Sequence, residues 1–121
     1  MGLLYPTMRR ELFEYLEWLS RAPSPSSEKD QEMVDHVVHF FFDDTGLADD
    51  PLRAVGAFLY DRQEAVAVAR VVAEIDQILL RYGTERPNRF YLQAPEWAEL
   101  TRLAGDTYRR LVTSDTALEE S

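Results

Sequence analysis

Four residues whose side chains can bind metals or transfer protons recur at one-turn spacing in the first half of the chain. They are Glu32, His36, His39 and Asp43. Successive residues of an α-helix are about 100° apart, so this spacing gathers all four on one stripe. Imidazole and carboxylate groups so placed can ligate zinc or iron, and a carboxylate–histidine pair can also move a proton. The alternative is a solvated helix face, where such neighbours only slightly stabilise the helix.

The segment that carries this stripe, residues 31–44, is predicted to be a helix. As a strand it would place histidine and aspartate among apolar residues, leaving neither face clean. As a helix, the polar residues fall on one stripe and the apolar residues from Met33 to Phe42 fill an arc of about 200°. So wide an arc predicts that other parts of the chain contact this helix from several sides.

Helical spacing of apolar residues continues along most of the chain, with helices expected over 8–21, 51–60 and 62–82 and a last one opened by Pro95. Asp50, Asp61 and Gly83 stand where helix caps are expected. Residues 22–30 are expected to form a flexible loop, 89–92 a short extended segment and 114–121 a disordered tail. The predicted fold class is all-α, a compact bundle of four to five helices that forms a single domain over residues 1–113.

Acidic residues are concentrated in one quarter of the chain. The net charge is −9, and residues 23–50 hold eight carboxylates against Lys29, which gives −7 there. Contacts to nucleic-acid phosphates require Lys and Arg, so direct nucleic-acid binding is disfavoured. A basic protein partner is favoured on the same grounds. The residues expected to bind it are Glu28, Asp30, Glu32, Asp35, His39, Asp43, Asp44 and Asp49.

The composition also argues against several classes of protein. There is no cysteine, which removes disulfides, thiolate metal sites and cysteine nucleophiles. The serines lack a nucleophile-elbow motif, and the five glycines form no phosphate-cradling loop. No apolar run approaches the roughly 18–20 residues that span a bilayer, and the N-terminal residues do not resemble a signal peptide. A cytoplasmic location without membrane contact is therefore expected.

A cluster of aromatic residues lies near two arginines late in the chain. Phe90, Tyr91 and Trp97 follow Arg86 and Arg89 closely. This mixture is typical of an interface hot spot. It equally fits a loop that its own aromatic side chains hold against the bundle.

Three stretches, VVHFFFDDTGLADDP, GAFLYDRQEAVAVARVVAEID and YLQAPEWAEL, resemble a family of small acidic proteins from actinobacteria that has no assigned activity. The matching residues are Val37, Val38, His39, Asp43, Asp44, Thr45, Asp50, Pro51, Tyr91, Leu92, Pro95 and Trp97. His36 is outside this pattern, so the resemblance directs attention to His39 with its two aspartates. His39 and Asp43 are one turn apart and can hydrogen-bond. Asp44, about 100° further round, is expected to cap the helix or meet the next segment.

The leading hypothesis is a non-enzymatic protein-interaction module without a cofactor. Its acidic surface would bind a basic protein, in an immunity-like or antitoxin-like role in one version. A second hypothesis is a metal-binding or hydrolytic protein that uses Glu32, His36, His39 and Asp43. A third is a structural bundle that forms a homodimer through its three consecutive phenylalanines.

Overall fold

The predicted all-α class is confirmed. The computed structural model describes residues 2–47 and 49–120, and these residues form helices and no strand. The elements are α1 (Pro6–Ser20), α2 (Glu28–His39), the π-helix η1 (Phe40–Asp44), the 3-10 helix η2 (Pro51–Ala54), α3 (Arg62–Tyr82), α4 (Asn88–Gln93) and α5 (Glu96–Glu120).

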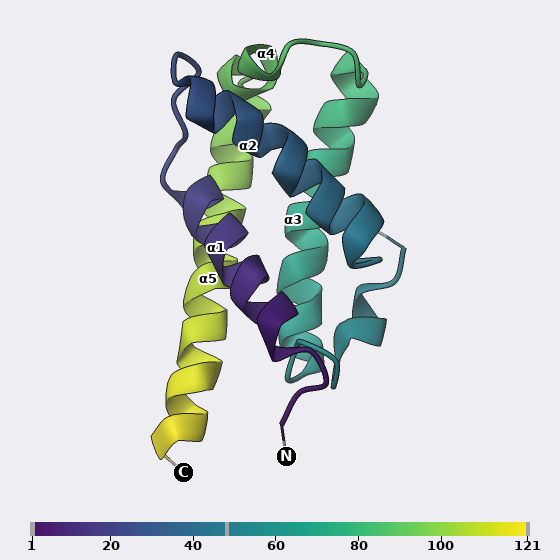
Figure 1. The fold of residues 1–121 in the computed structure, drawn as a ribbon, viewed down its shortest axis with the longest axis vertical. Coiled ribbons are helices and arrows are strands. Elements are labelled where there is room, and N and C mark those ends of the chain that lie inside the picture. The colour runs from purple at the N-terminus through teal and green to yellow at the C-terminus, as the bar shows by residue number, and fades with distance from the viewer. Residues whose placement is uncertain (1, 48, 121) are drawn as a thin grey trace.

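The two longest helices, α3 and α5, run side by side and form the back of the bundle in the view of Figure 1. In that view α1 lies against α5, and α2 crosses in front of both long helices. The short α4 connects α3 to α5 at one end. The core contains residues at helical spacing on each element, including Leu12, Leu16 and Leu19 of α1, Val34 and Val37 of α2, Val68, Val71 and Ile75 of α3, and Leu100, Ala104 and Leu111 of α5.

The predicted helix caps around α3 are confirmed. The Asp61 carboxylate accepts a hydrogen bond from the Glu64 amide at 2.8 Å, and Gly83, with φ of 82°, ends the helix. Asp50 caps η2 in the same way, with Leu52 as the donor at 3.2 Å. A side-chain acceptor at these positions satisfies amides that have no partner within the helix.

Two predicted local structures are wrong. Residues 51–60 were expected to be helical, but only the single turn of η2 forms, and Gly56 then adopts a positive φ of 88°. The carbonyls of Gly56 and Ala57 instead accept hydrogen bonds from the N-terminal backbone at Leu4 and Tyr5. Local turn hydrogen bonds to the Ala54 carbonyl, together with this pairing to the N-terminal backbone, therefore take the place of a continuous helix.

Residues 89–92, expected to be extended, belong to the helix α4. Packing decides this, because Tyr91 and Leu92 are buried and the Phe90 ring stands edge-on to Tyr82 at 5.1 Å. The strand propensity of aromatic residues is weak compared with such burial. The aromatic cluster thus packs against the bundle, with the Arg86 guanidinium over the Phe90 ring.

Helix ends also lie further out than expected. α2 begins at Glu28 with Ser27 as its N-cap, so the loop before it is shorter than the predicted 22–30. Residues 114–121 were expected to be a disordered tail, but residues 114–120 continue α5, and Ser121 lies outside the described residues. An ion pair between Asp115 and Arg9 of α1 explains part of this extension. Across the described residues, none of the helices has the length and apolar character needed to cross a membrane.

Candidate functional site

His39, at the end of α2, lies between two carboxylates. Its Nδ1 is 2.8 Å from Asp43 Oδ2, and its Nε2 is 3.1 Å from Asp44 Oδ1. The predicted pairing with Asp43 is therefore confirmed. Asp44 was expected to cap the helix or to meet the next segment, and in the structure its carboxylate also reaches the other nitrogen of the same ring.

The π-helix η1 explains why both aspartates reach the ring. An α-helix brings residue i+4 beside residue i, whereas a π turn closes its hydrogen bonds at i+5. The Thr45 amide donates to the Phe40 carbonyl at 3.1 Å, which is such a wider turn. Asp44 stands five residues after His39, so the local geometry that carries it to the imidazole is not visible in an α-helical projection.

The three side chains are open to solvent. Their exposed fractions are 63% for His39, 66% for Asp43 and 52% for Asp44. Only a protonated imidazole has an N–H group on each ring nitrogen, so the ring forms ion pairs with these carboxylates only in its protonated form. Exposed pairs of this kind contribute little to stability, about 0–1 kcal/mol. Their carboxylates retain free lone pairs for a partner.

A groove of about 460 Å³ lies beside these residues, between α2 and the end of the bundle where α3 joins α4. Its apolar lining comes from Val34, Val38, Leu79 and Tyr91, and its polar lining includes Asp35, His36, His39 and Asp43. A concave apolar floor with polar groups along its edge is the usual form of a binding site. In this groove the ionisable groups along the edge are carboxylates and histidines.

Most of the residues predicted to bind a partner are exposed. This holds for Glu28, Glu32, Asp35, His39, Asp43, Asp44 and Asp49.

Asp30 differs from the other predicted partner-binding residues, because its carboxylate is used within the chain. Trp18 Nε1 and the Ser24 amide each donate to it at 2.9 Å. The indole hydrogen bond, followed by that of Ser24, lowers the pKa of Asp30 below its ordinary value. Asp30 therefore joins α1 and the following loop to α2.

The predicted metal-binding stripe is not brought together as a ligand cluster. Within the part of the chain that the structure describes, no group of three or more His, Asp or Glu residues is placed to hold a metal ion. Helical spacing puts Glu32, His36, His39 and Asp43 on one side of α2, but the His39 ring turns toward Asp43 and Asp44. Its two nitrogens are thereby occupied by carboxylates.

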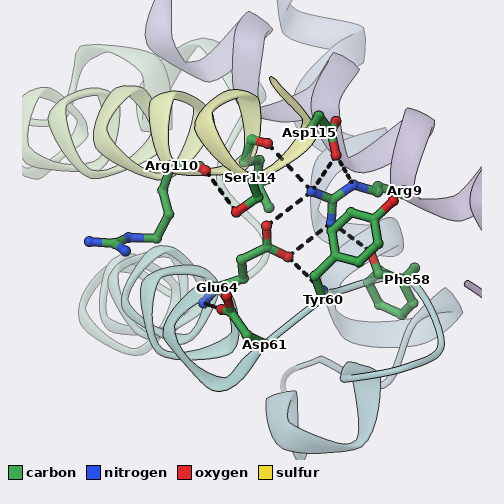
Figure 2. Close-up of polar contacts among 9 residues, drawn as sticks. Arg9, Phe58, Tyr60, Asp61, Glu64, Arg110, Ser114 and Asp115 are labelled. Carbon is green, nitrogen blue, oxygen red and sulfur yellow. Dashed lines mark hydrogen bonds and ion pairs between the residues drawn. The ribbon is translucent and has the colours of Figure 1, made fainter. Parts of the chain in front are cut away.

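A buried cluster of charged residues, which was not predicted from the sequence, lies at the other end of the bundle (Figure 2). Both terminal nitrogens of Arg9 contact the Glu64 carboxylate at 3.0 Å, and one of them also contacts Asp115 Oδ1 at 3.0 Å. Arg9 further donates to the Phe58 carbonyl at 3.0 Å and lies over the Tyr60 ring, 4.3 Å from its centroid. Glu64 is fully buried.

Every donor of this guanidinium has a partner, so its charge is compensated inside the protein. Burial by itself lowers the pKa of Arg9, but the hydrogen bond and negative charge of Glu64 outweigh it and raise the pKa. The cluster joins α1, the loop before α3, the first turn of α3 and the end of α5. Its role is thus structural.

Two signals in the sequence could have revealed this cluster. Arg9 stands three, seven and ten residues before Leu12, Leu16 and Leu19, which places it on the buried face of α1. Glu64 stands three residues after the cap Asp61, where a capping box directs the carboxylate back toward the preceding amides. In the structure it accepts from the Tyr60 amide at 2.7 Å, one residue before the N-cap.

Comparison with known proteins identifies a family, but the description of that family names no activity. A family model described as a domain of unknown function (DUF7945) matches residues 3–119. Neither a curated protein nor a solved structure matches the chain.

Proposed function

We propose that this chain, which belongs to the DUF7945 family of unknown function, is a non-enzymatic binding module for a basic protein. The binding surface is the acidic segment of residues 28–50, centred on the groove beside His39. A finer version gives it an immunity-like or antitoxin-like role, in which it covers a cationic protein and blocks its activity.

The observation that carries this proposal is the form of the groove. Val34, Val38 and Leu79 provide an apolar floor, while Asp35 and Asp43 stand along its edge. Lys and Arg side chains have apolar stems and charged tips, so a basic segment can lay its stems on the floor and pair its tips with the carboxylates. The aspartates beside His39 extend the negative surface past the end of α2.

Charge steering supports the same choice of partner. The segment of residues 23–50 carries −7 of the total net charge of −9. Charge of one sign gathered on one surface accelerates the approach of a partner of opposite sign and repels competitors of like sign. The rate constant for association is therefore expected to fall as ionic strength rises.

Self-association through the three phenylalanines receives less support. Phe40 is 1% exposed and Phe41 is fully buried, while Phe42 packs against the core from its edge. These rings are covered within one chain and do not require a second copy. Homodimer formation stays a prediction, but the three phenylalanines no longer support it.

Affinity capture at low salt from a lysate of the source organism tests the proposal. The test variant carries Asp35→Asn, Asp43→Asn and Asp44→Asn. A control with the same change of net charge carries Glu11→Gln, Glu14→Gln and Glu85→Gln, all exposed and outside the segment.

The expected result is a basic protein that the wild type and the control retain and the test variant loses. Stopped-flow association with that protein, at several salt concentrations, then checks the steering. Equal retention by all three proteins, or equal loss by both variants, contradicts a role for this groove.

A further inference from the structure

A second groove, lined by arginines, lies between α3 and α5. Its volume is about 570 Å³, and its lining consists of Arg62, Gln63, Val66, Ala67, Arg70 and Arg110. None of these residues belongs to the acidic segment of residues 28–50. The groove holds three positive charges and no negative one, in a chain where acidic residues outnumber basic ones by 22 to 13.

The arginines of this groove differ from most others in the chain. Arg9, Arg21, Arg53, Arg102 and Arg109 each pair with a carboxylate. Arg62 and Arg70 have no hydrogen bond or ion pair within the described residues. Arg110 donates to a neutral group, the Gln63 side chain, at 3.0 Å. All three guanidinium groups thus retain the capacity to bind an anion.

The helix geometry places these charges around one apolar strip. Arg62, Val66 and Arg70 recur every four residues, so they share one face of α3, about 12 Å from end to end. Val66 is 43% exposed between the two arginines. Arg110 comes from α5 on the other side, and Figure 2 shows its guanidinium directed away from the buried cluster of Arg9.

A carboxylate one turn before Arg110 on α5 is already engaged. Asp106 lines the neighbouring hollow on α5, where it pairs with both Arg102 and Arg109. It therefore does not neutralise the arginines of the groove.

We propose that this groove binds a small molecule that carries linked phosphate groups and an apolar ring. Guanidinium groups match phosphate oxygens in a bidentate geometry. Linked phosphates place several charges along a short chain, which suits three arginines spread over the groove better than a single anion does. The exposed surface of Val66 and Ala67 supports the ring, and the volume lies within the usual range for small-molecule sites.

Isothermal titration calorimetry at low ionic strength tests this, with adenosine triphosphate, tripolyphosphate and the tricarboxylate citrate as separate probes. The variants are Arg62→Gln, Arg70→Gln and Arg110→Gln, each checked for its fold by circular dichroism. Arg89→Gln is the matched control, because Arg89 is exposed on α4 outside the groove.

The expected order of affinity is adenosine triphosphate, then tripolyphosphate, then citrate. Each groove variant is expected to weaken adenosine triphosphate binding about tenfold, and the control to leave it unchanged. In the wild type, the amide resonances of Val66 and Ala67 are expected to shift on titration.

Absence of binding at millimolar adenosine triphosphate overturns the proposal, as does equal weakening by Arg89→Gln. Tighter binding of citrate than of tripolyphosphate overturns the assignment to phosphate. None of these results bears on the acidic surface, since the two sites share no residue.

Discussion

Two clusters of ionisable side chains, one around Arg9 and one around His39, differ in depth. At one end of the bundle Arg9 is held by Glu64 and Asp115, with Glu64 fully buried. At the end of α2, His39 stands between Asp43 and Asp44 with all three side chains more than half exposed. The distances are alike, between 2.8 and 3.1 Å.

The two clusters differ in the burial of their side chains and not in the distances between their charged atoms. We expect the buried cluster to stabilise the fold and the exposed one to be accessible to a partner. When a buried charge loses its partner, no water molecule takes the partner's place. Removing one residue of a buried cluster therefore leaves the others uncompensated. An exposed charge exchanges its partner for water at little cost, and it can equally exchange it for a residue of another protein. Substitutions in the buried cluster are therefore expected to change stability more than substitutions in the exposed one.

Arg9→Ala is expected to lower the free energy of unfolding by about 3–5 kcal/mol, because it leaves the Glu64 carboxylate buried and uncompensated. Urea unfolding followed by circular dichroism measures this. Arg10→Ala is the control, since Arg10 is the exposed neighbour on the same helix, with an expected change within about 0.5 kcal/mol. Equal effects of the two substitutions contradict the structural role of Arg9.

The double variant Arg9→Met with Glu64→Leu sharpens the comparison by removing both buried charges at once. It is expected to be more stable than Arg9→Ala by about 1–2 kcal/mol, since no unpaired charge remains inside. The Phe58 carbonyl and Tyr60 amide still lose their partners, which limits the recovery. The same urea titration decides this. A double variant less stable than the single one shows that polar contacts, and not the buried charge, dominate.

Asp30 lies between the two extremes of depth and gives a pH-dependent test. Its pKa is lowered in the folded state, mainly by the Trp18 indole, below its ordinary value of 3.8. Its contribution to stability is therefore present above pH 3.8 and is lost as the pH falls through the lower folded-state pKa. Asp30→Ala is expected to cost about 1 kcal/mol at neutral pH, a difference that shrinks in acid.

The free energy of unfolding of Asp30→Ala, measured across the pH range, tests this expectation. The Trp18 indole proton, followed by NMR, reports on the hydrogen bond itself. Asp35→Ala removes the same charge from an exposed site on the same helix and controls for net charge. If both variants lose stability with the same dependence on pH, the hydrogen bonds of Asp30 carry no specific contribution.

His39→Ala is expected to change the free energy of unfolding by less than about 1 kcal/mol, the smallest effect of the series. The reason is the exposure of His39 and both its partners. Thermal unfolding at neutral pH is sufficient to measure it. A loss comparable to that of Arg9→Ala removes the distinction between the two clusters.

Local sequence signals predicted the elements that depend on near neighbours. The caps at Asp50 and Asp61 and the end of α3 at Gly83 were predictable, because a cap needs only residues within one turn. The pairing of His39 with Asp43 followed from one-turn spacing. The second pairing, with Asp44, did not, since the π turn that produces it differs from the α-helix assumed in any projection.

Contacts between residues far apart in the sequence decided the features that local patterns did not predict. Arg9 and Glu64 are 55 positions apart, and Arg9 and Asp115 are 106 apart. The pattern around Arg9 places it on a buried face, but nothing in the pattern tells which carboxylate meets it. The helical form of residues 114–120 is linked to the same cluster through Asp115, so a prediction from local composition ended α5 too early.

The sequence by itself determined the all-α class, the helix boundaries that have local caps and the concentration of negative charge in residues 23–50. These properties depend on periodicity, short-range hydrogen bonds and composition. The tertiary structure alone decided which charges are buried and which are free, because burial depends on what the rest of the chain places around a residue. That decision separates Arg9 and Glu64, which are buried and paired, from the aspartates beside His39 and the arginines that line the α3–α5 groove, which are exposed.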